Sequence, residues 1–327
     1  MSTLRFSNQI VLITGAAGFI GSHLAETIMN EGGQVIGVDN FITGQKKHID
    51  MLVEQFGTAF KFIEADVSSN PEEYLAEEQK IDLILHFASP ASPPKYQEHP
   101  METYLVNSMG THQLLSFLRV HHPQAKFLFA STSEIYGNPL VHPQTEMYWG
   151  NVNPNGVRSC YDESKRMGET ICGVFQRDFE MDVRMVRIFN TYGPRIDLED
   201  GRIIPSFINA VLNKTPMLIF GDGSQTRSFC YVDDLVSGIL ALAVHPDGNG
   251  QTLNLGNPGE FTVLETVKVF ELIVGESLAL EHRPLPQDDP MRRQPDITKA
   301  KSLLNWEPKV SFEQGLIKTL QYFQAQH

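Results

Sequence analysis

Short apolar runs rich in β-branched residues alternate with segments of helical periodicity along the first half of the chain. The pattern predicts strands over residues 9–14, 34–38, 60–67, 81–88, 126–130 and 183–189. Apolar positions at helical spacing follow the first run, and a longer helical pattern covers about residues 101–120. Apolar strands that alternate with helices are typical of a sheet buried on both faces. The chain is therefore predicted to be an α/β protein with a Rossmann-type, doubly wound parallel sheet.

The C-terminal part of the chain has shorter and more mixed elements. It is expected to contain a helix near residues 201–212, a helix over 233–243, a strand over 252–255 and an amphipathic helix over about 311–323. The helix near 233 and the strand near 252 are expected to return to the sheet. We therefore predict a Rossmann domain over residues 1–185, with return segments near 228–255, and a smaller mixed lobe over residues 186–327.

A glycine-rich turn joins the first predicted strand to the first helix. Gly15, Gly18 and Gly21 have the strand–turn–helix context of a dinucleotide fingerprint, although the first gap is one residue longer than in the commonest version. Such glycines allow a tight turn and let a pyrophosphate approach the helix N-terminus. Asp39 ends the second strand, where an acid accepts from ribose hydroxyls and repels a 2′-phosphate. NAD is therefore the predicted cofactor, and a turn without a ligand is the alternative.

Polar residues gather after the later strands, at the edge where open α/β sheets bind ligands. Asp66 lies at the end of the third strand and either touches an adenine or caps the next segment. His86, in the fourth strand, is interpreted as a histidine satisfied at the edge of the core. The fifth strand runs into Thr132 and Glu134, which are able to bind a sugar oxygen and to act as an acid or base. The alternative is a Ser/Thr-rich turn with a solvated glutamate.

Tyr161 and Lys165 are four residues apart, so on a helix they lie one turn apart on the same face. Ser159 and Asp162 fit a capping box that would start this helix just before Tyr161. A nearby ammonium group favours the phenolate, so we expect Lys165 to lower the pKa of Tyr161. That would let the tyrosine take a proton from an alcohol near neutral pH. By itself this spacing also fits an ordinary exposed helical turn.

Composition narrows the class of partner. The formal net charge is -13 over 327 residues and no basic stripe is visible, which argues against a nucleic-acid partner. The three cysteines lack zinc-site spacing, so we expect reduced thiols in a cytoplasmic protein and no metal site. We expect neither a secretory signal nor a membrane partner, because the apolar runs are too short for either.

Longer segments carry a resemblance that the generic motifs do not. With the glycine turn, Asp39, Thr132, Tyr161 and Lys165 in order, the chain resembles extended short-chain dehydrogenases/reductases that act on nucleotide sugars. At finer grain it is similar to the UDP-glucuronate decarboxylase (UDP-xylose synthase) family. The resemblance covers nearly the whole chain and is carried by DNFITG at 39–44, HFASPASPPKY at 86–96, ASTSEIYG at 130–137, HPQTEMYWGNVNPNGVRSCYDESKR at 142–166, RIFNTYGPR at 187–195, GDGSQTRSFCYVDDLV at 221–236 and QDDPMRRQPDITKA at 287–300.

The resemblance implies NAD in the N-terminal domain, a UDP-sugar in the C-terminal lobe, and a homodimer through helices near 101–120 and 161–178. The catalytic residues that it implies are Tyr161, Lys165, Thr132, Ser133, Glu134 and Arg293. The cofactor residues are Gly15, Gly18, Phe19, Ile20, Gly21, Asp39, Asn40, Phe41, Thr43, Gly44, Asp66, Val67, Ala88, Tyr161 and Lys165. The substrate residues are Ser89, Asn190, Arg202, Arg227 and Arg293. The chain departs mildly from the family at Ser164, Asn155 and Val157, which puts loop geometry more than chemistry in doubt.

The activity expected from this resemblance is NAD-dependent decarboxylation of UDP-glucuronate to UDP-xylose. Oxidation of the C4 hydroxyl makes a β-keto acid, CO2 leaves, and C4 is reduced again. A 4,6-dehydratase and a 4-epimerase share the first step. The dehydratase family carries an acid where this chain has Ser133, and epimerases usually lack the acid found here at Glu134, so decarboxylation is favoured. The remaining alternative is a catalytically silent NAD-binding regulator, which we would expect to have lost Tyr161 or Lys165.

Overall fold

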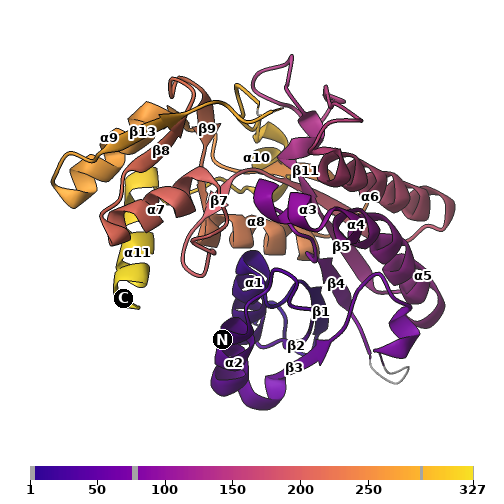
Figure 1. The fold of residues 1–327 in the computed structure, drawn as a ribbon. Helices are drawn as coiled ribbons and strands as arrows, with labels where there is room; N and C mark the ends of the chain where they lie inside the picture. The colour runs from indigo at the N-terminus through magenta and orange to yellow at the C-terminus, as the bar shows by residue number, and fades with distance from the viewer. Residues whose placement is uncertain (1–3, 76–79, 288–289, 327) are drawn as a thin grey trace.

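A seven-stranded sheet organises the chain, with the strand order β11-β6-β5-β4-β1-β2-β3 (Figure 1). The computed structural model describes residues 4–75, 80–287 and 290–326. The strands are β1 (Ile10–Thr14), β2 (Gln34–Asp39), β3 (Phe60–Glu64), β4 (Leu83–His86), β5 (Lys126–Thr132), β6 (Val183–Ile188) and β11 (Thr252–Leu255). Every pairing in this sheet is parallel. The order reverses between β1 and β4, and a ligand crevice is expected at such a switch point.

Helices cover both faces of the sheet, because successive residues of each strand point to opposite sides. Val11 and Ile13 pack into one core with residues of α1 (Phe19–Asn30), α2 (Lys46–Phe56) and α8 (Val232–Val244). Leu12 packs into a second core on the opposite face. The helical segments contributing to that core are η3 (Val106–Gly110), α5 (Thr111–His121) and α6 (Ser159–Asp178), and α4 (Pro100–Leu105) continues into η3.

The remaining elements form a smaller group beside the sheet, on the left of Figure 1. Its strands pair two by two: β7 (Thr191–Tyr192) with β10 (Cys230–Tyr231), β8 (Met217–Phe220) with β13 (Leu280–Arg283), and β9 (Thr226–Ser228) with β12 (Glu260–Thr262). Its helices are α7 (Ile203–Asn213), α9 (Val263–Val274) and α11 (Phe312–Gln324), whereas α10 (Thr298–Leu304) packs against α8 and against β11 of the large sheet. Short helical turns complete the chain at α3 (Pro93–Glu98), η1 (Gly57–Ala59), η2 (Pro71–Glu73) and η4 (Ser133–Tyr136).

The predicted α/β class and the parallel sheet are confirmed. The strand expected near residue 252 does return to the sheet, where β11 pairs with β6. The helix expected over 101–120 is present, but a π-helical turn at Val106–Gly110 interrupts it. The capping box at Ser159 and Asp162 is wrong, because Ser159 is already the first helical residue and no side chain caps α6. Among the described residues, no helix combines the length and apolar content that a membrane crossing requires.

Candidate active site

A cavity of about 710 Å³ lies where the carboxyl ends of β1, β5 and β6 meet the C-terminal elements. A smaller cavity of about 70 Å³ adjoins it and shares Gly15, Gly18 and Thr43 with it. The main cavity is lined by the predicted residues Gly15, Gly18, Phe19, Ile20, Gly21, Thr43, Ser89, Thr132, Ser133, Glu134, Tyr161, Lys165, Asn190, Arg202, Arg227 and Arg293. The smaller one is lined by Asp39, Asn40, Gly44, Asp66, Val67 and Ala88. Phe41 lines neither cavity. Its ring packs against that of Phe62, with the two ring centroids 5.3 Å apart.

The glycine turn leaves no room for side chains. Gly15 has a φ of +75°, and a Cβ there would lie 2.8 Å from the backbone of Phe87 and Ala88. A Cβ on Gly21 would lie 2.0 Å from the carbonyl oxygen of Gly15. The bare backbone at the N-terminus of α1 therefore borders both cavities, as a cradle for a dinucleotide pyrophosphate requires.

Asp39 lies in the smaller cavity with its carboxylate held in place. The Ala17 N–H donates to one oxygen at 3.0 Å, and the Phe41 N–H donates to the other at 2.8 Å. Burial raises the pKa of Asp39 above its ordinary value, while these hydrogen bonds oppose the rise. Each carboxylate oxygen keeps lone pairs for further donors. The aspartate is thus oriented to accept from the hydroxyls of a ribose.

Tyr161 and Lys165 share one face of α6, as predicted, and both are buried. The Tyr161 ring stacks on that of Tyr96, and Thr132 hydrogen-bonds its hydroxyl. Lys165 donates to the Ala130 carbonyl at 2.8 Å, and its Nζ is 5.8 Å from the Tyr161 ring centroid.

The expectation that Lys165 makes Tyr161 acidic is wrong for this state of the protein. Burial raises the pKa of Tyr161 to about 12, and the hydrogen bond from Thr132 opposes this only in part. Burial also lowers the pKa of Lys165 to about 7. Desolvation therefore dominates both pKa shifts, and a positive charge close to the Tyr161 hydroxyl would favour the phenolate.

Glu134 is held between two arginines. It forms ion pairs with Arg158 and with Arg293, whose Nη1 lies 3.0 Å from the carboxylate. Burial alone would raise the pKa of Glu134, but Arg293, Arg158 and Arg227 together hold it well below its usual range. Glu134 is therefore a carboxylate at neutral pH, suited to accept hydrogen bonds rather than to supply a stored proton.

The other predicted arginines enter the main cavity from the C-terminal elements. Arg202, at the start of α7, forms a two-pronged ion pair with Asp200, with distances of 2.5 and 2.8 Å. Arg227 lies on β9 and donates to the Thr226 carbonyl at 2.8 Å. Cationic side chains thus face the Tyr161 side of the cavity from several elements, which suits an anionic ligand.

Sequence reasoning left several residues that line the main cavity unassigned, among them Tyr96, Arg158 and Arg195. Arg158 precedes Tyr161 by three residues, so helical spacing could have drawn attention to it. Arg195 pairs with Glu26 of α1, and its position after β6 was the available signal. No spacing pointed to Tyr96. Among the described residues, no group of three or more His, Cys, Asp or Glu side chains is arranged to hold a metal ion.

A bare glycine turn at a helix N-terminus, a buried aspartate at the end of β2 and a buried Tyr/Lys pair beside a cavity lined by arginines are the features expected of a nicotinamide-dependent enzyme. Comparison with known families agrees, since residues 11–256 match the model described as "NAD dependent epimerase/dehydratase family". The chain belongs to this family.

Its relatives narrow the class further. The chain is 48% identical over 314 residues to UDP-glucuronic acid decarboxylase 1 of Arabidopsis thaliana, covering 96% of this chain and 69% of the relative. It is 49% identical over 307 residues to decarboxylase 2 of the same plant, with 94% and 66% coverage. The zebrafish (Danio rerio) UDP-glucuronic acid decarboxylase 1 is 45% identical over 313 residues, with 96% and 72% coverage. The chain therefore spans about two thirds of the length of these relatives.

Solved structures share the fold over nearly the whole chain. A UDP-glucose 4-epimerase from Thermotoga maritima, with UDP-glucose, superposes with a TM-score of 0.87 at 29% identity, covering 97% of this chain and 99% of the other. A UDP-glucuronic acid 4-epimerase from Bacillus cereus, in complex with UDP-glucuronic acid and NAD, gives a TM-score of 0.85 at 28% identity, covering 98% and 100%.

Proposed function

We propose that this protein is an NAD-dependent decarboxylase that converts UDP-glucuronate to UDP-xylose. The observation that carries the proposal is the position of Arg293. Its Nη1 donates to Ser133 at 2.9 Å and to Glu134 at 3.0 Å, in the cavity that also holds Tyr161. A buried guanidinium beside the reacting sugar is suited to orient a carboxylate. Similarity to several UDP-glucuronic acid decarboxylases over most of the chain supports the same activity.

The ligand assignments follow the two cavities. The turn at Gly15, Gly18 and Gly21 holds the NAD pyrophosphate, and Asp39 accepts from the adenosine ribose. The remaining assigned cofactor residues line the same cavities, apart from Phe41, whose role stays a prediction. Arg202 and Arg227 neutralise the UDP diphosphate. When bound, NAD supplies the acceptor for the C4 hydride, returns that hydride at the end, and in its oxidised form carries a positive charge that favours the Tyr161 phenolate.

The protein groups then act on the sugar in order. Tyr161 takes the proton of the C4 hydroxyl, and the resulting ketone makes the substrate a β-keto acid. The C5–carboxylate bond breaks, CO2 leaves, and its electron pair delocalises onto the C4 oxygen as an enolate. Thr132 and protonated Tyr161 stabilise that oxygen by hydrogen bonds. Arg293 orients the carboxylate, although tight pairing with it alone would stabilise the ground state and would not raise the rate.

The proton that C5 takes up comes from solvent. Because Glu134 is ionised at neutral pH, we assign it the role of holding the water that delivers this proton. The net reaction consumes one proton for each CO2 released, and the phenol of Tyr161 returns its own proton to the C4 oxygen when C4 is reduced.

The two rival reactions fit the cavity less well. A 4,6-dehydratase needs an acid that protonates the leaving C6 hydroxyl, and Ser133 stands where that acid is expected. A 4-epimerase has no need of the ionised Glu134 that Arg158 and Arg293 hold in place.

The proposed decarboxylation is tested by measuring the release of labelled CO2 from carboxyl-labelled UDP-glucuronate by the purified protein with NAD. Absence of labelled CO2, with the protein folded and NAD bound, would refute the proposal.

We also propose a homodimer in the cytoplasm. Helices α4 and α6 and the η3 turn carry apolar side chains that are exposed in one chain, among them Met101, Tyr104, Met109 and Met167. Exposed apolar patches of this kind mark protein interfaces. The three cysteines are free thiols, which suits a reducing compartment. Light scattering on the purified protein tests the dimer, and a monomeric mass at micromolar concentration would contradict it.

A further inference from the structure

Arg293 reaches the active site from a segment without regular structure. It is 1% exposed, and besides Ser133 and Glu134 it donates to the Gly137 carbonyl at 3.0 Å. All three partners lie about 160 residues earlier in the chain, in η4 or directly after it, where the chain leaves β5. The side chain of arginine has many rotamers, so its position depends on how firmly its backbone is anchored.

Gln144 provides that anchor on the C-terminal side of Arg293. Its side-chain oxygen accepts from the Gln294 N–H at 3.0 Å, and its backbone N–H donates to the Gln294 carbonyl at 2.9 Å. Its own carbonyl accepts from the Asp296 N–H at 2.9 Å, and its side-chain amide donates to the Val141 carbonyl at 2.9 Å. The Gln294 N–H belongs to the peptide bond that directly follows Arg293, so this side chain fixes the backbone that carries the guanidinium.

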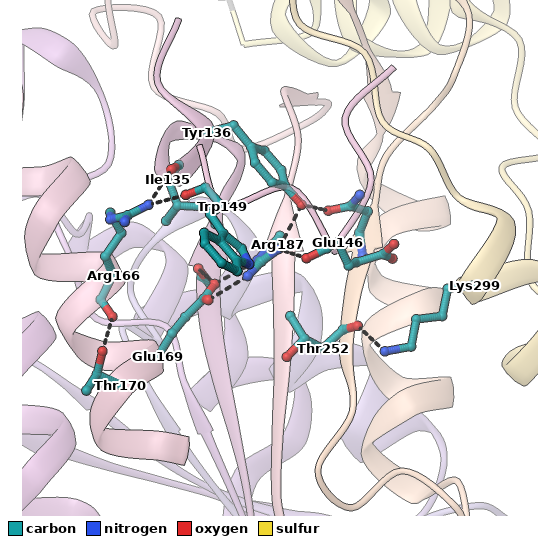
Figure 2. A network of polar contacts seen from close by, with 12 residues as sticks. Ile135, Tyr136, Glu146, Trp149, Arg166, Glu169, Thr170, Arg187, Thr252 and Lys299 are labelled. Carbon is teal, nitrogen blue, oxygen red and sulfur yellow. Dashed lines mark hydrogen bonds and ion pairs between the residues drawn. The ribbon is translucent and has the colours of Figure 1, made fainter. Parts of the chain in front are cut away.

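A buried polar network ties Gln144 to the sheet. Asn254 of β11 donates to the Gln144 carbonyl at 2.9 Å and accepts from the Tyr136 hydroxyl at 2.8 Å. Figure 2 shows Tyr136 next to Arg187, which donates to the Tyr136 hydroxyl at 2.9 Å and binds both carboxylate oxygens of Glu169. The Ser131 hydroxyl, next to Thr132 in the chain, donates to the same Glu169 carboxylate.

The network therefore runs from β5 to the peptide after Arg293, and Gln144 is its last member. Gln144 is fully buried, and both polar groups of its side chain have partners. Burying an amide is costly unless its hydrogen bonds are made, so these contacts specify one arrangement of the segment. Loss of the side-chain oxygen would leave the Gln294 N–H unpaired and free the Arg293 backbone to shift.

We propose that Gln144 is a positioning residue that holds Arg293 against Ser133 and Glu134 for the decarboxylation step. The proposal rests on the proposed function, in which Arg293 orients the substrate carboxylate. Oxidation at C4 depends on Tyr161 and Thr132, which Gln144 does not contact. A defect at Gln144 therefore slows CO2 loss more than C4 oxidation, and the 4-keto acid accumulates.

The test compares Gln144→Leu, which removes the acceptor, with Gln144→Glu, which keeps it. Gln144→Leu is expected to lower kcat for CO2 release about fivefold or more, with KM for UDP-glucuronate within about twofold. The fraction of 4-keto acid trapped by borohydride should rise. Gln144→Glu should recover most of the loss at mildly acidic pH, where a buried protonated carboxyl reproduces both hydrogen bonds. Gln314→Leu breaks the capping box of α11 instead and should lower stability while kcat stays unchanged.

Two results would overturn the proposal. One is a Gln144→Leu variant that releases CO2 at the wild-type rate. The other is an equal loss of C4 oxidation and CO2 release, which would indicate general damage. A double variant with Arg293→Lys adds a check, because residues that act through each other have non-additive effects. If Gln144→Leu does not fold, Gln144→Met, which also removes the amide oxygen but keeps the length of the side chain, answers the same question.

Hydrogen exchange tests the anchoring of the Arg293 backbone independently of the reaction that the protein catalyses. The Gln294 amide should exchange about tenfold faster in Gln144→Leu than in the wild type or in Gln314→Leu. Unchanged protection would refute the anchoring whatever the reaction is. A wild-type protein that releases no CO2, with this amide deprotected only in Gln144→Leu, would refute the function and leave the anchoring intact.

Discussion

The ring of Tyr96 stacks on the ring of Tyr161, with centroids 5.1 Å apart and planes inclined by 6°. Tyr96 belongs to α3, which follows β4 after a loop that lines the main cavity. Its side chain is fully buried. The stack holds the Tyr161 ring in one orientation and excludes water from it. The same exclusion raises the pKa of Tyr161 to about 12. The protein thus keeps its proposed base protonated until a positive charge enters the cavity.

Tyr161→Phe should abolish turnover and leave the fold intact. Phenylalanine keeps the stack on Tyr96 and loses only the hydroxyl that Thr132 contacts. Loss of a general base typically costs about 10²–10⁴ in rate, so kcat should fall by about that factor. NAD binding, followed by fluorescence, should change little. Full activity in this variant would remove Tyr161 as the base.

Glu134→Gln should impair both catalysis and stability. The change removes the negative charge that pairs with Arg158 and Arg293. Breaking a buried ion pair costs about 3–5 kcal/mol, and we expect a loss near the lower end, together with a fall in kcat of about 100-fold. Denaturant melts and steady-state kinetics measure the two effects. Glu163→Gln is the matched control, since its half-exposed pair with Arg166 should contribute under about 1 kcal/mol. Equal effects of the two substitutions would contradict the assignment.

Gly21→Ala should destabilise the cofactor turn, whereas Gly173→Ala should not. A Cβ at Gly21 would lie 2.0 Å from the Gly15 carbonyl oxygen, so the backbone must shift. We expect a loss of about 2 kcal/mol or more in the free energy of unfolding and weaker NAD binding. A Cβ at Gly173 meets only the end of the flexible Arg177 side chain, and alanine there favours the helix by up to about 1 kcal/mol. A Gly21→Ala protein with wild-type NAD affinity would refute the cradle.

The stability of the protein should fall steeply as the pH is lowered below 6.5. Burial lowers the pKa of His86 to about 3, and of His23 and His48 to about 4, from an ordinary value of 6.5. The unfolded chain therefore binds these protons first, so the stability is fully present above pH 6.5 and is lost as the pH falls toward the folded values.

Each of these histidines should lower the free energy of unfolding by about 1.4 kcal/mol for each pH unit between about pH 6 and 4.5. His86→Asn keeps an acceptor for the Thr14 hydroxyl, which lies 2.7 Å from the ring, and removes one titrating group. Urea unfolding at several pH values should show a slope smaller by about 1.4 kcal/mol per pH unit in this variant. An unchanged slope would show that His86 does not resist protonation in the fold.

The parts of the site that depend on strand ends could be predicted from the sequence. Asp39 and Thr132 end β2 and β5, and the carboxyl ends of parallel strands meet at one edge of the sheet. The Tyr161–Lys165 face followed from helical spacing alone. His86 was also predicted as a satisfied core histidine, and it is 1% exposed, with contacts to Thr14 and the Val106 carbonyl.

Other parts of the site depend on tertiary contacts that the periodicity of apolar residues along the chain does not reveal. Arg293 arrives through an irregular segment whose backbone pairs with Gln144, and only family resemblance pointed to it. Tyr96 gave no signal because its role arises from stacking across two elements. The pKa of Tyr161 was predicted in the wrong direction, since helical spacing reveals a neighbouring ammonium but not the desolvation of both groups. Of the resemblance segment at 287–300, residues 288–289 lie outside the described part of the chain.

The most direct test of the account is the mass of the product that the purified protein makes from UDP-glucuronate in the presence of NAD. We predict a UDP-pentose that, in the same charge state, is lighter than the substrate by one CO2, with UDP-xylose as the released sugar nucleotide. A product of unchanged mass, epimerised at C4, would contradict the account. So would the loss of water from another nucleotide sugar with no CO2 released from UDP-glucuronate.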